Sequence, residues 1–190
     1  MTATKILVFA GSTRAGSLST KLAAAAAKEL ALADADVTRI SLADYALPIY
    51  DGDLEKEVGI PDNATQLARL IAAHQGAFIA TPEYNNSVPP LLKNTIDWIS
   101  RVESSKVPYR NRVFAVGSVS NGPIGGARAL PDLRKIAQAG LGAIPIPEKI
   151  EVGRAREAFT ESGELAVEPV AKLLSRVCRS LVALAGRLAD

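Results

Sequence analysis

The sequence is poor in the residues that most often build catalytic and redox centres, with one cysteine and one histidine among 190 residues. The single cysteine, Cys178, excludes a disulfide within the chain and favours a reducing compartment. The formal net charge is only +2, and no run of lysines and arginines occurs, so neither nucleic acid nor a membrane surface is expected as a partner. No apolar run approaches the length of a membrane span. We therefore expect a cytoplasmic protein.

Length and patterning predict one α/β domain over residues 1–190. Apolar runs without alternation are typical of strands buried on both faces of a parallel sheet, whereas the alternating run at 37–42 indicates an edge strand. Strands and helices alternate along the chain, which predicts a three-layer, doubly wound sheet of five parallel strands. The predicted strands are 5–10, 37–42, 77–81, 112–118 and 143–146, and the predicted helices are 17–33, 63–73, 89–102, 125–138 and 169–188.

Residues 44–61 are predicted to be irregular because they contain Pro48, Gly52, Gly59 and Pro61. A connection this long in a compact domain is often functional. Its carboxylates do not follow the calcium-loop pattern. We interpret the segment as a solvated loop near the rim of a site and expect no metal there.

The turn at residues 11–17 joins the first strand to the first helix and is rich in glycine and hydroxyls. Free N–H groups and the positive end of the helix dipole favour an anion, usually a phosphate, at such a turn. Thr13 replaces the second glycine of a dinucleotide fingerprint, and Ser17 replaces the lysine of a P-loop. With Arg14 as a cation, the loop suits a terminal phosphate monoester. The alternative is an ordinary turn with Ser17 as N-cap.

Two further polar loops, at 82–87 and 118–123, follow the third and fourth strands and therefore lie at the same edge of the sheet. Residues 118–122 come close to the nucleophile elbow of hydrolases. The only histidine, His74, precedes this serine-containing loop and is expected at a helix end, so a hydrolase is disfavoured. Cys178 lies in a helical apolar stripe and is predicted to be a core residue.

Four short blocks carry the most specific signal in the chain. They are Gly11-Ser12-x-Arg14-x-x-Ser17, Thr81-Pro82-Glu83-Tyr84-Asn85, Pro90-x-x-Lys93-Asn94-x-x-Asp97-Trp98 and Ser120-x-Gly122-x-x-Gly125-Gly126-Ala127-Arg128. In this order they resemble the NADPH-dependent FMN reductase family of flavodoxin-like proteins, which includes quinone, chromate and azo-dye reductases. The resemblance covers roughly residues 4–150.

The resemblance implies a flavodoxin-like sheet with strand order 2-1-3-4-5 and FMN as cofactor. The FMN phosphate would lie in the first loop, and the loops at 82–85 and 118–122 would hold the isoalloxazine ring, largely through backbone N–H groups. No catalytic side chain is implied, because the cofactor performs the chemistry. The implied cofactor-binding residues are Ser12, Arg14, Ser17, Ser19, Pro82, Glu83, Tyr84, Asn85, Ser118, Ser120 and Gly122.

The resemblance also implies an enzyme that transfers a hydride from NADPH or NADH through FMN to a small-molecule acceptor in a ping-pong cycle. The acceptors would be quinone-like compounds, chromate, azo compounds or free flavin. A flavodoxin-type FMN electron carrier is the second hypothesis, disfavoured by the near-neutral charge and by an aromatic content of 5%. A phosphate-binding module without flavin is the third.

The helix between Leu91 and Val102 carries more apolar residues than one buried stripe needs. The resemblance implies homodimers or homotetramers, so we place this helix at a subunit interface with Trp98 as candidate anchor. Burial of the same residues within one subunit is the alternative.

Overall fold

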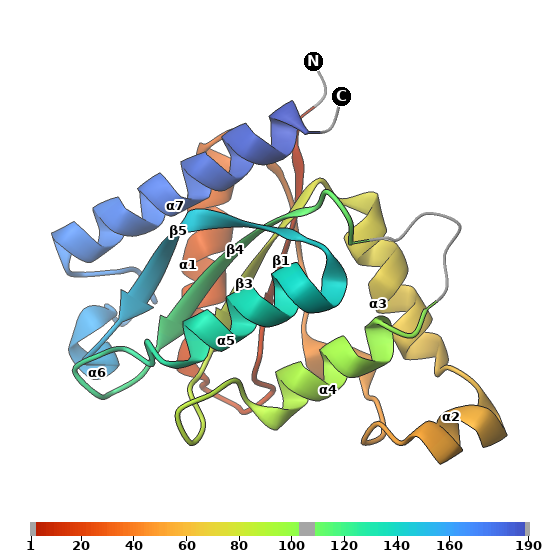
Figure 1. Ribbon diagram of the computed structural model, residues 1–190. Helices are drawn as coiled ribbons and strands as arrows, with labels where there is room; N and C mark the ends of the chain where they lie inside the picture. The colour runs from red at the N-terminus through yellow and green to blue at the C-terminus, as the bar shows by residue number, and fades with distance from the viewer. Residues whose placement is uncertain (1–2, 103–108, 189–190) are drawn as a thin grey trace.

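The computed structural model describes residues 3–102 and 109–188 (Figure 1). One sheet of five parallel strands has the order β2-β1-β3-β4-β5, which confirms the predicted fold class and strand order. The strands are β1 (Lys5–Ala10), β2 (Asp36–Arg39), β3 (Gly76–Thr81), β4 (Val113–Val119) and β5 (Ile144–Val152). As predicted, β2 lies at an edge.

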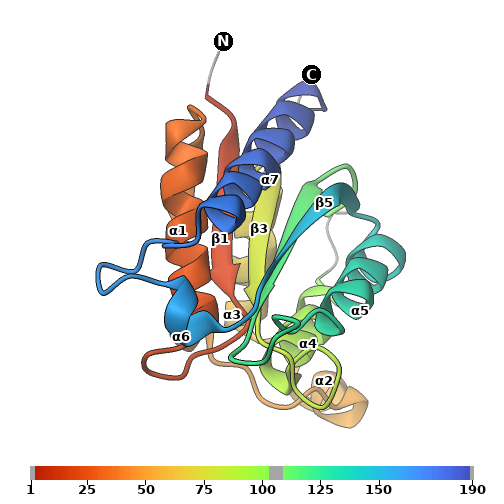
Figure 2. The ribbon, with the colours of Figure 1, turned by 90° about the vertical axis from the view of Figure 1, so that its left-hand side faces the viewer.

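Helices cover both faces of the sheet, with α1 and α7 on one side and α4 and α5 on the other (Figure 2). Because β1 is buried on both faces, Ile6 and Val8 join the core beneath α1 and α7, whereas Leu7 and Phe9 join the core beneath α3, α4 and α5. No helix in the described ranges is long and apolar enough to cross a membrane. The helices are α1 (Leu18–Leu32), η1 (Leu42–Tyr45), α2 (Gly52–Val58), α3 (Asp62–Ala73), α4 (Pro90–Ile99), α5 (Ala129–Lys135), η2 (Ile136–Gly140), α6 (Ala155–Ala158) and α7 (Glu168–Arg187).

Cys178 and His74 both have the structural positions that the sequence predicted. Cys178 is fully buried between α7 and α1, and burial raises the pKa of its thiol, so the reactive thiolate is disfavoured. His74 is the C-cap of α3, and its Nδ1 lies 2.6 Å from the carbonyl oxygen of Leu70. Neither residue lies at the carboxyl edge of the sheet, so neither supports a hydrolase or a thiol mechanism.

Three predicted boundaries differ from the structure. The second strand ends at Arg39, and the fifth continues to Val152. The fifth strand contains prolines but is an edge strand with one neighbour, where a missing N–H is tolerated. The fourth long helix begins at Ala129 and not at residue 125, because Gly125 and Gly126 have φ values of +64° and +79°.

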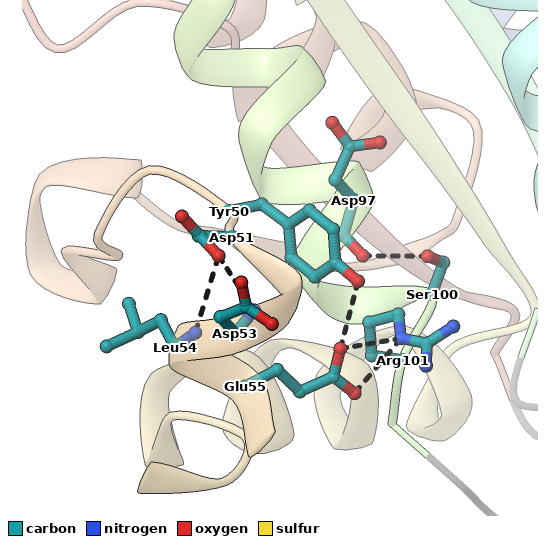
Figure 3. A network of polar contacts seen from close by, with 8 residues as sticks. All are labelled: Tyr50, Asp51, Asp53, Leu54, Glu55, Asp97, Ser100 and Arg101. Atoms are coloured by element: carbon teal, nitrogen blue, oxygen red, sulfur yellow. Dashed lines mark hydrogen bonds and ion pairs between the residues drawn. The ribbon is translucent and has the colours of Figure 1, made fainter. Parts of the chain in front are cut away.

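The prediction of an irregular loop over 44–61 is also wrong, because α2 forms within it. Asp51 caps this helix by accepting hydrogen bonds from the N–H groups of Asp53 and Leu54. We call residues 46–58 the strap. Figure 3 shows how the strap is tied to the end of α4: the Tyr50 hydroxyl donates to Glu55, and Arg101 Nε lies 3.0 Å from both oxygens of the same carboxylate.

Trp98 is fully buried by its own chain, so the hypothesis that it anchors a subunit interface is wrong. Its Nε1 donates to the carbonyl oxygen of Pro48 at 2.8 Å, and its ring meets that of Tyr50 edge-on with centroids 5.0 Å apart. Asn94 donates to the same carbonyl and accepts from the Tyr50 N–H. The apolar excess of α4 is thus explained in part by the strap that covers it. An interface over the remainder of α4 stays a prediction.

Candidate functional site

The loops after β1, β3 and β4 meet at the carboxyl edge of the sheet, the lower edge in Figure 1, around a cavity of about 140 Å³. This is where ligands bind in open α/β sheets. We call it the loop cavity. Eight of the eleven residues that the sequence predicted for the cofactor line it: Ser12, Arg14, Ser17, Ser19, Pro82, Glu83, Tyr84 and Ser120.

The N-terminus of α1 opens into the loop cavity without a side-chain cap. Ser17 occupies the N-cap position, but its hydroxyl makes no capping hydrogen bond and lies 2.8 Å from the hydroxyl of Ser19. Both serines are almost completely buried, and the first turn contains no acidic residue. The helix dipole and the first N–H groups are therefore free to bind an anion. Arg14 is exposed in the same loop, where its guanidinium can add a bidentate contact.

The loop after β3 contains a two-residue hairpin turn. Tyr84 and Ser87 exchange backbone hydrogen bonds of 3.0 Å, and Asn85 and Asn86 between them have φ values of +48° and +66°. Two successive positive φ values define a type I′ turn, which favours asparagine. The turn uses the N–H of Tyr84, so this group is not available to a ligand. The Tyr84 side chain lines the cavity and is half-exposed, whereas Asn85 lies at the exposed tip, outside the lining.

Glu83 joins the loop after β3 to the loop after β4. Its Oε2 accepts the backbone N–H of Arg128 at 2.8 Å, and its Oε1 lies 3.7 Å from the Arg128 guanidinium. Gly126 of the loop after β4 lies close to Glu83, because a Cβ at this glycine would stand 3.3 Å from the Glu83 Cβ. Sequence reasoning placed Glu83 at the cofactor but missed this partner. The signal was present, because both residues belong to the blocks that carry the family resemblance.

Ser118 and Gly122 lie beside the loop cavity, outside its lining. Ser118 is fully buried in β4, and its hydroxyl has no hydrogen-bond partner within residues 3–102 and 109–188. A buried hydroxyl without a partner is rare and is commonly satisfied by a ligand or a water. Gly122 donates its N–H to the hydroxyl of Ser120 at 3.2 Å, so the glycine shapes the loop that presents Ser120.

Comparison with known proteins gives concordant matches. The profile of the family described as NADPH-dependent FMN reductase matches residues 4–157. A quinone reductase of Escherichia coli is 39% identical over 133 residues, which cover 70% of this chain and 68% of the relative. An NAD(P)H-dependent FMN reductase of Pseudomonas aeruginosa is 31% identical over 179 residues, or 93% and 92% of the two chains. The solved structure of FerB, a flavoenzyme NAD(P)H:(acceptor) oxidoreductase from Paracoccus denitrificans, superposes with a TM-score of 0.79 at 27% identity, covering 97% and 98%.

The fold and the site define a flavodoxin-like oxidoreductase. The chain belongs to the NADPH-dependent FMN reductase family, whose cofactor is FMN and whose electron donor is a reduced nicotinamide nucleotide. The residues present fit this cofactor: the N-terminus of α1 has no side-chain cap, and the buried Ser118 hydroxyl at the end of β4 has no partner among the residues that the structure describes.

Proposed function

We propose that the chain is an NAD(P)H-dependent quinone reductase that binds the phosphate of FMN at the N-terminus of α1. The observation that carries this proposal is the uncapped N-terminus of α1, which opens into a cavity formed by three loops. The relatives named quinone reductase support the acceptor class. Chromate, azo compounds and free flavin are further electron acceptors that the same exposed site could bind and reduce.

Each predicted residue has a role in this proposal. The hydroxyls of Ser17 and Ser19 now bond each other at 2.8 Å and can both turn to phosphate oxygens, joined by Ser12 and by the Arg14 guanidinium. A cavity of about 140 Å³ is smaller than the roughly 300 Å³ or more of a typical ligand pocket, so it accommodates only the phosphate end. The isoalloxazine ring then lies outward, against Tyr84.

The remaining residues would hold and orient the ring. Pro82 and the Tyr84 hairpin would form one wall, and Ser120, whose hydroxyl accepts the N–H of Gly122, would form the other. The Glu83–Arg128 contact fixes the separation of these walls. Ser118, whose buried hydroxyl has no partner among the described residues, would hydrogen-bond the cofactor, whereas Asn85 lies at the hairpin tip and would act only at the rim. When bound, FMN supplies the redox chemistry by accepting a hydride and passing electrons onward.

The test is a visible spectrum of the purified protein with FMN, before and after anaerobic addition of NADPH, followed by steady-state assays with benzoquinone. We expect FMN to bind, its bands to bleach, and double-reciprocal plots to be parallel, as a ping-pong cycle requires. Bleaching without quinone turnover would favour the flavodoxin-type carrier. Failure to bind FMN would overturn the proposal.

The proposal includes a cytoplasmic homodimer or homotetramer with α4 near the interface. Ile49 and Val58 of the strap, which is tied to α4, are large apolar residues with exposed fractions of 76% and 65%. Burial of such residues by a second copy would stabilise an assembly. Light scattering coupled to size-exclusion chromatography tests this, and a monomer at micromolar concentration would contradict it.

A further inference from the structure

A second and larger cavity, of about 300 Å³, lies beside the loop cavity at the carboxyl end of β2. We call it the β2 cavity. Ser12 lines both cavities, so the two adjoin across the loop after β1. The other polar groups of its lining are Thr20 from α1, Arg39 at the end of β2, and Ser41 and Asp44 at η1. The proposed quinone reductase site gives none of these four residues a role.

The β2 cavity combines a small apolar floor with a polar rim. Ala10 and Ala23, only 7% and 2% exposed, lie in the floor. Such small side chains leave room for a flat ring above them. The rim supplies a guanidinium that can bind a phosphate bidentately and a carboxylate that can accept from a hydroxyl or an amine. Its volume of about 300 Å³ lies at the lower end of the range for small-molecule sites. Together these features match a nucleoside carrying a phosphate.

The position of Arg39 supports this assignment. In doubly wound dinucleotide-binding sheets, a residue beyond the second strand reads the ribose: an acidic side chain binds the 2′-hydroxyl, and an arginine accommodates a 2′-phosphate. Arg39 is the last residue of β2 and pairs with Val8 of β1. Side chains two residues apart on a strand share a face, so Arg39 lies on the same face as Val37, which packs against the core beneath α1. Thr20 of α1 lines the same cavity.

Asp44 lies in η1, five residues after Arg39, and the turn that carries it is fixed by hydrogen bonds. Its N–H donates to the Ser41 carbonyl oxygen at 3.2 Å, and the Ser41 hydroxyl accepts the N–H of Ala43 at 3.2 Å. A carboxylate disfavours a nearby phosphate, so the phosphate belongs to Arg39 and Thr20. Asp44 is then free to accept from a ribose hydroxyl or from the amine of adenine.

The spacing of the strands suits one extended dinucleotide that starts in the β2 cavity. Neighbouring strands are about 4.8 Å apart, so β2 lies roughly 10 Å from β3 and about 14 Å from β4 across the sheet. We propose that the β2 cavity binds the adenosine 2′-phosphate end of NADPH, while the nicotinamide reaches the flavin over the loops after β3 and β4. This inference rests on the proposed function. It assigns Arg39 as the residue that distinguishes NADPH from NADH.

The first test uses the wild-type protein loaded with FMN and measures binding of 2′,5′-ADP and 5′-AMP by titration calorimetry. We expect 2′,5′-ADP to bind about tenfold to a hundredfold more tightly, as charge-assisted hydrogen bonds to one phosphate would provide. Equal affinities would overturn the inference, because the cavity would then not read the phosphate. Since no variant is needed, a folding defect cannot obscure this result.

The second test compares kcat/KM for NADPH and NADH among variants. We expect Arg39→Ala to lower kcat/KM for NADPH about tenfold or more and that for NADH less than twofold. Asp44→Ala should lower both equally, because ribose and adenine are common to the two donors. Arg69→Ala, which removes an exposed arginine of α3 with the same charge change, is the matched control and should alter neither.

The two failures are distinguishable. If the wild type neither binds FMN nor oxidises a nicotinamide nucleotide, the proposed function fails. If it is active but Arg39→Ala changes NADPH and NADH alike, or changes neither, only the β2 cavity assignment fails. FMN affinity, followed by quenching of flavin fluorescence, should be the same for Arg39→Ala and wild type. A loss of FMN binding in that variant would mean that the cavity belongs to the flavin phosphate.

Discussion

The strap and the loops at the carboxyl edge differ in how their polar groups are satisfied. In the strap, the Pro48 carbonyl accepts from Asn94 and Trp98. The Tyr50 hydroxyl and the Glu55 carboxylate likewise have partners on the chain itself (Figure 3). At the edge, the Ser118 hydroxyl has no partner in the described residues, and α1 has no side-chain cap. Satisfied groups stabilise a fold, whereas unsatisfied ones cost free energy unless a ligand pairs with them. We therefore infer that the strap stabilises the fold, whereas the loops at the carboxyl edge of the sheet bind the ligand.

The largest effect is expected in the strap. Trp98→Ala removes a fully buried indole and its hydrogen bond to Pro48, so the free energy of unfolding should fall by about 3–5 kcal/mol. Urea denaturation of the FMN-free protein measures this. FMN affinity of the folded variant should stay within about threefold of wild type, because Trp98 lies outside the loop cavity. If Trp98→Ala keeps its stability but loses FMN binding, the assignment of the strap to stability is wrong.

The next effect concerns the hydroxyls at α1. In the double variant Ser17→Ala/Ser19→Ala, the FMN dissociation constant should rise about 100-fold, since two hydrogen bonds to a charged group are lost. Stability without FMN should change by less than about 1 kcal/mol, because the two hydroxyls currently satisfy each other. Flavin fluorescence and urea denaturation measure the two quantities. A large loss of stability with unchanged FMN affinity would assign this pair to folding.

A smaller effect is expected for the contact that joins the two loops. Glu83→Ala leaves the Arg128 N–H without its carboxylate partner, and the FMN dissociation constant should rise about tenfold as the loops separate. Glu151→Ala, which breaks an ion pair with Lys149 on β5, serves as control. If both variants bind FMN as tightly as wild type, the two loops do not need the Glu83 contact to hold the cofactor.

The smallest effect is a dependence of stability on pH. The hydrogen bond from Tyr50, together with Arg101, lowers the pKa of the Glu55 carboxyl below its ordinary value. A pKa lower in the folded state gives stability above the unfolded pKa, which is lost as pH falls through the folded pKa, below about pH 4. Glu55→Gln should therefore melt slightly below wild type at pH 7 and equally near pH 3. Glu57→Gln on the same helix is the control. If both variants have the same dependence of melting temperature on pH, the contacts of Glu55 do not contribute to stability.

The sequence predicted the sheet and most of the loop cavity because both signals are local. An unbroken apolar run such as residues 5–10 predicts a buried strand, and the hydroxyls after it predict an anion site at the following helix. The predicted edge position of β2 and the core position of Cys178 are confirmed for the same reason. These features depend only on neighbouring residues, so one sequence is sufficient to find them.

The features that sequence reasoning missed depend on contacts between distant segments. The strap covers Trp98, whose hydrogen-bond partner Pro48 lies 50 residues earlier in the chain. Without that long-range contact, the apolar face of α4 resembles a subunit interface. The partner of Glu83 lies 45 residues away. The β2 cavity brings together Ser12 from the loop after β1 and Arg39 from the end of β2. The helix α2 was missed because Gly52 and Gly59 flank a short run, although Asp51 is a recognisable N-cap.

The most direct test of the account is the affinity of the wild-type protein for FMN compared with riboflavin, which lacks only the phosphate. If the uncapped N-terminus of α1, its serines and Arg14 bind that phosphate, FMN should bind at least about 100-fold more tightly than riboflavin. Fluorescence titration of both flavins under the same conditions gives the ratio. Equal affinities would contradict the account, because the free groups at the edge would then bind something other than the cofactor phosphate.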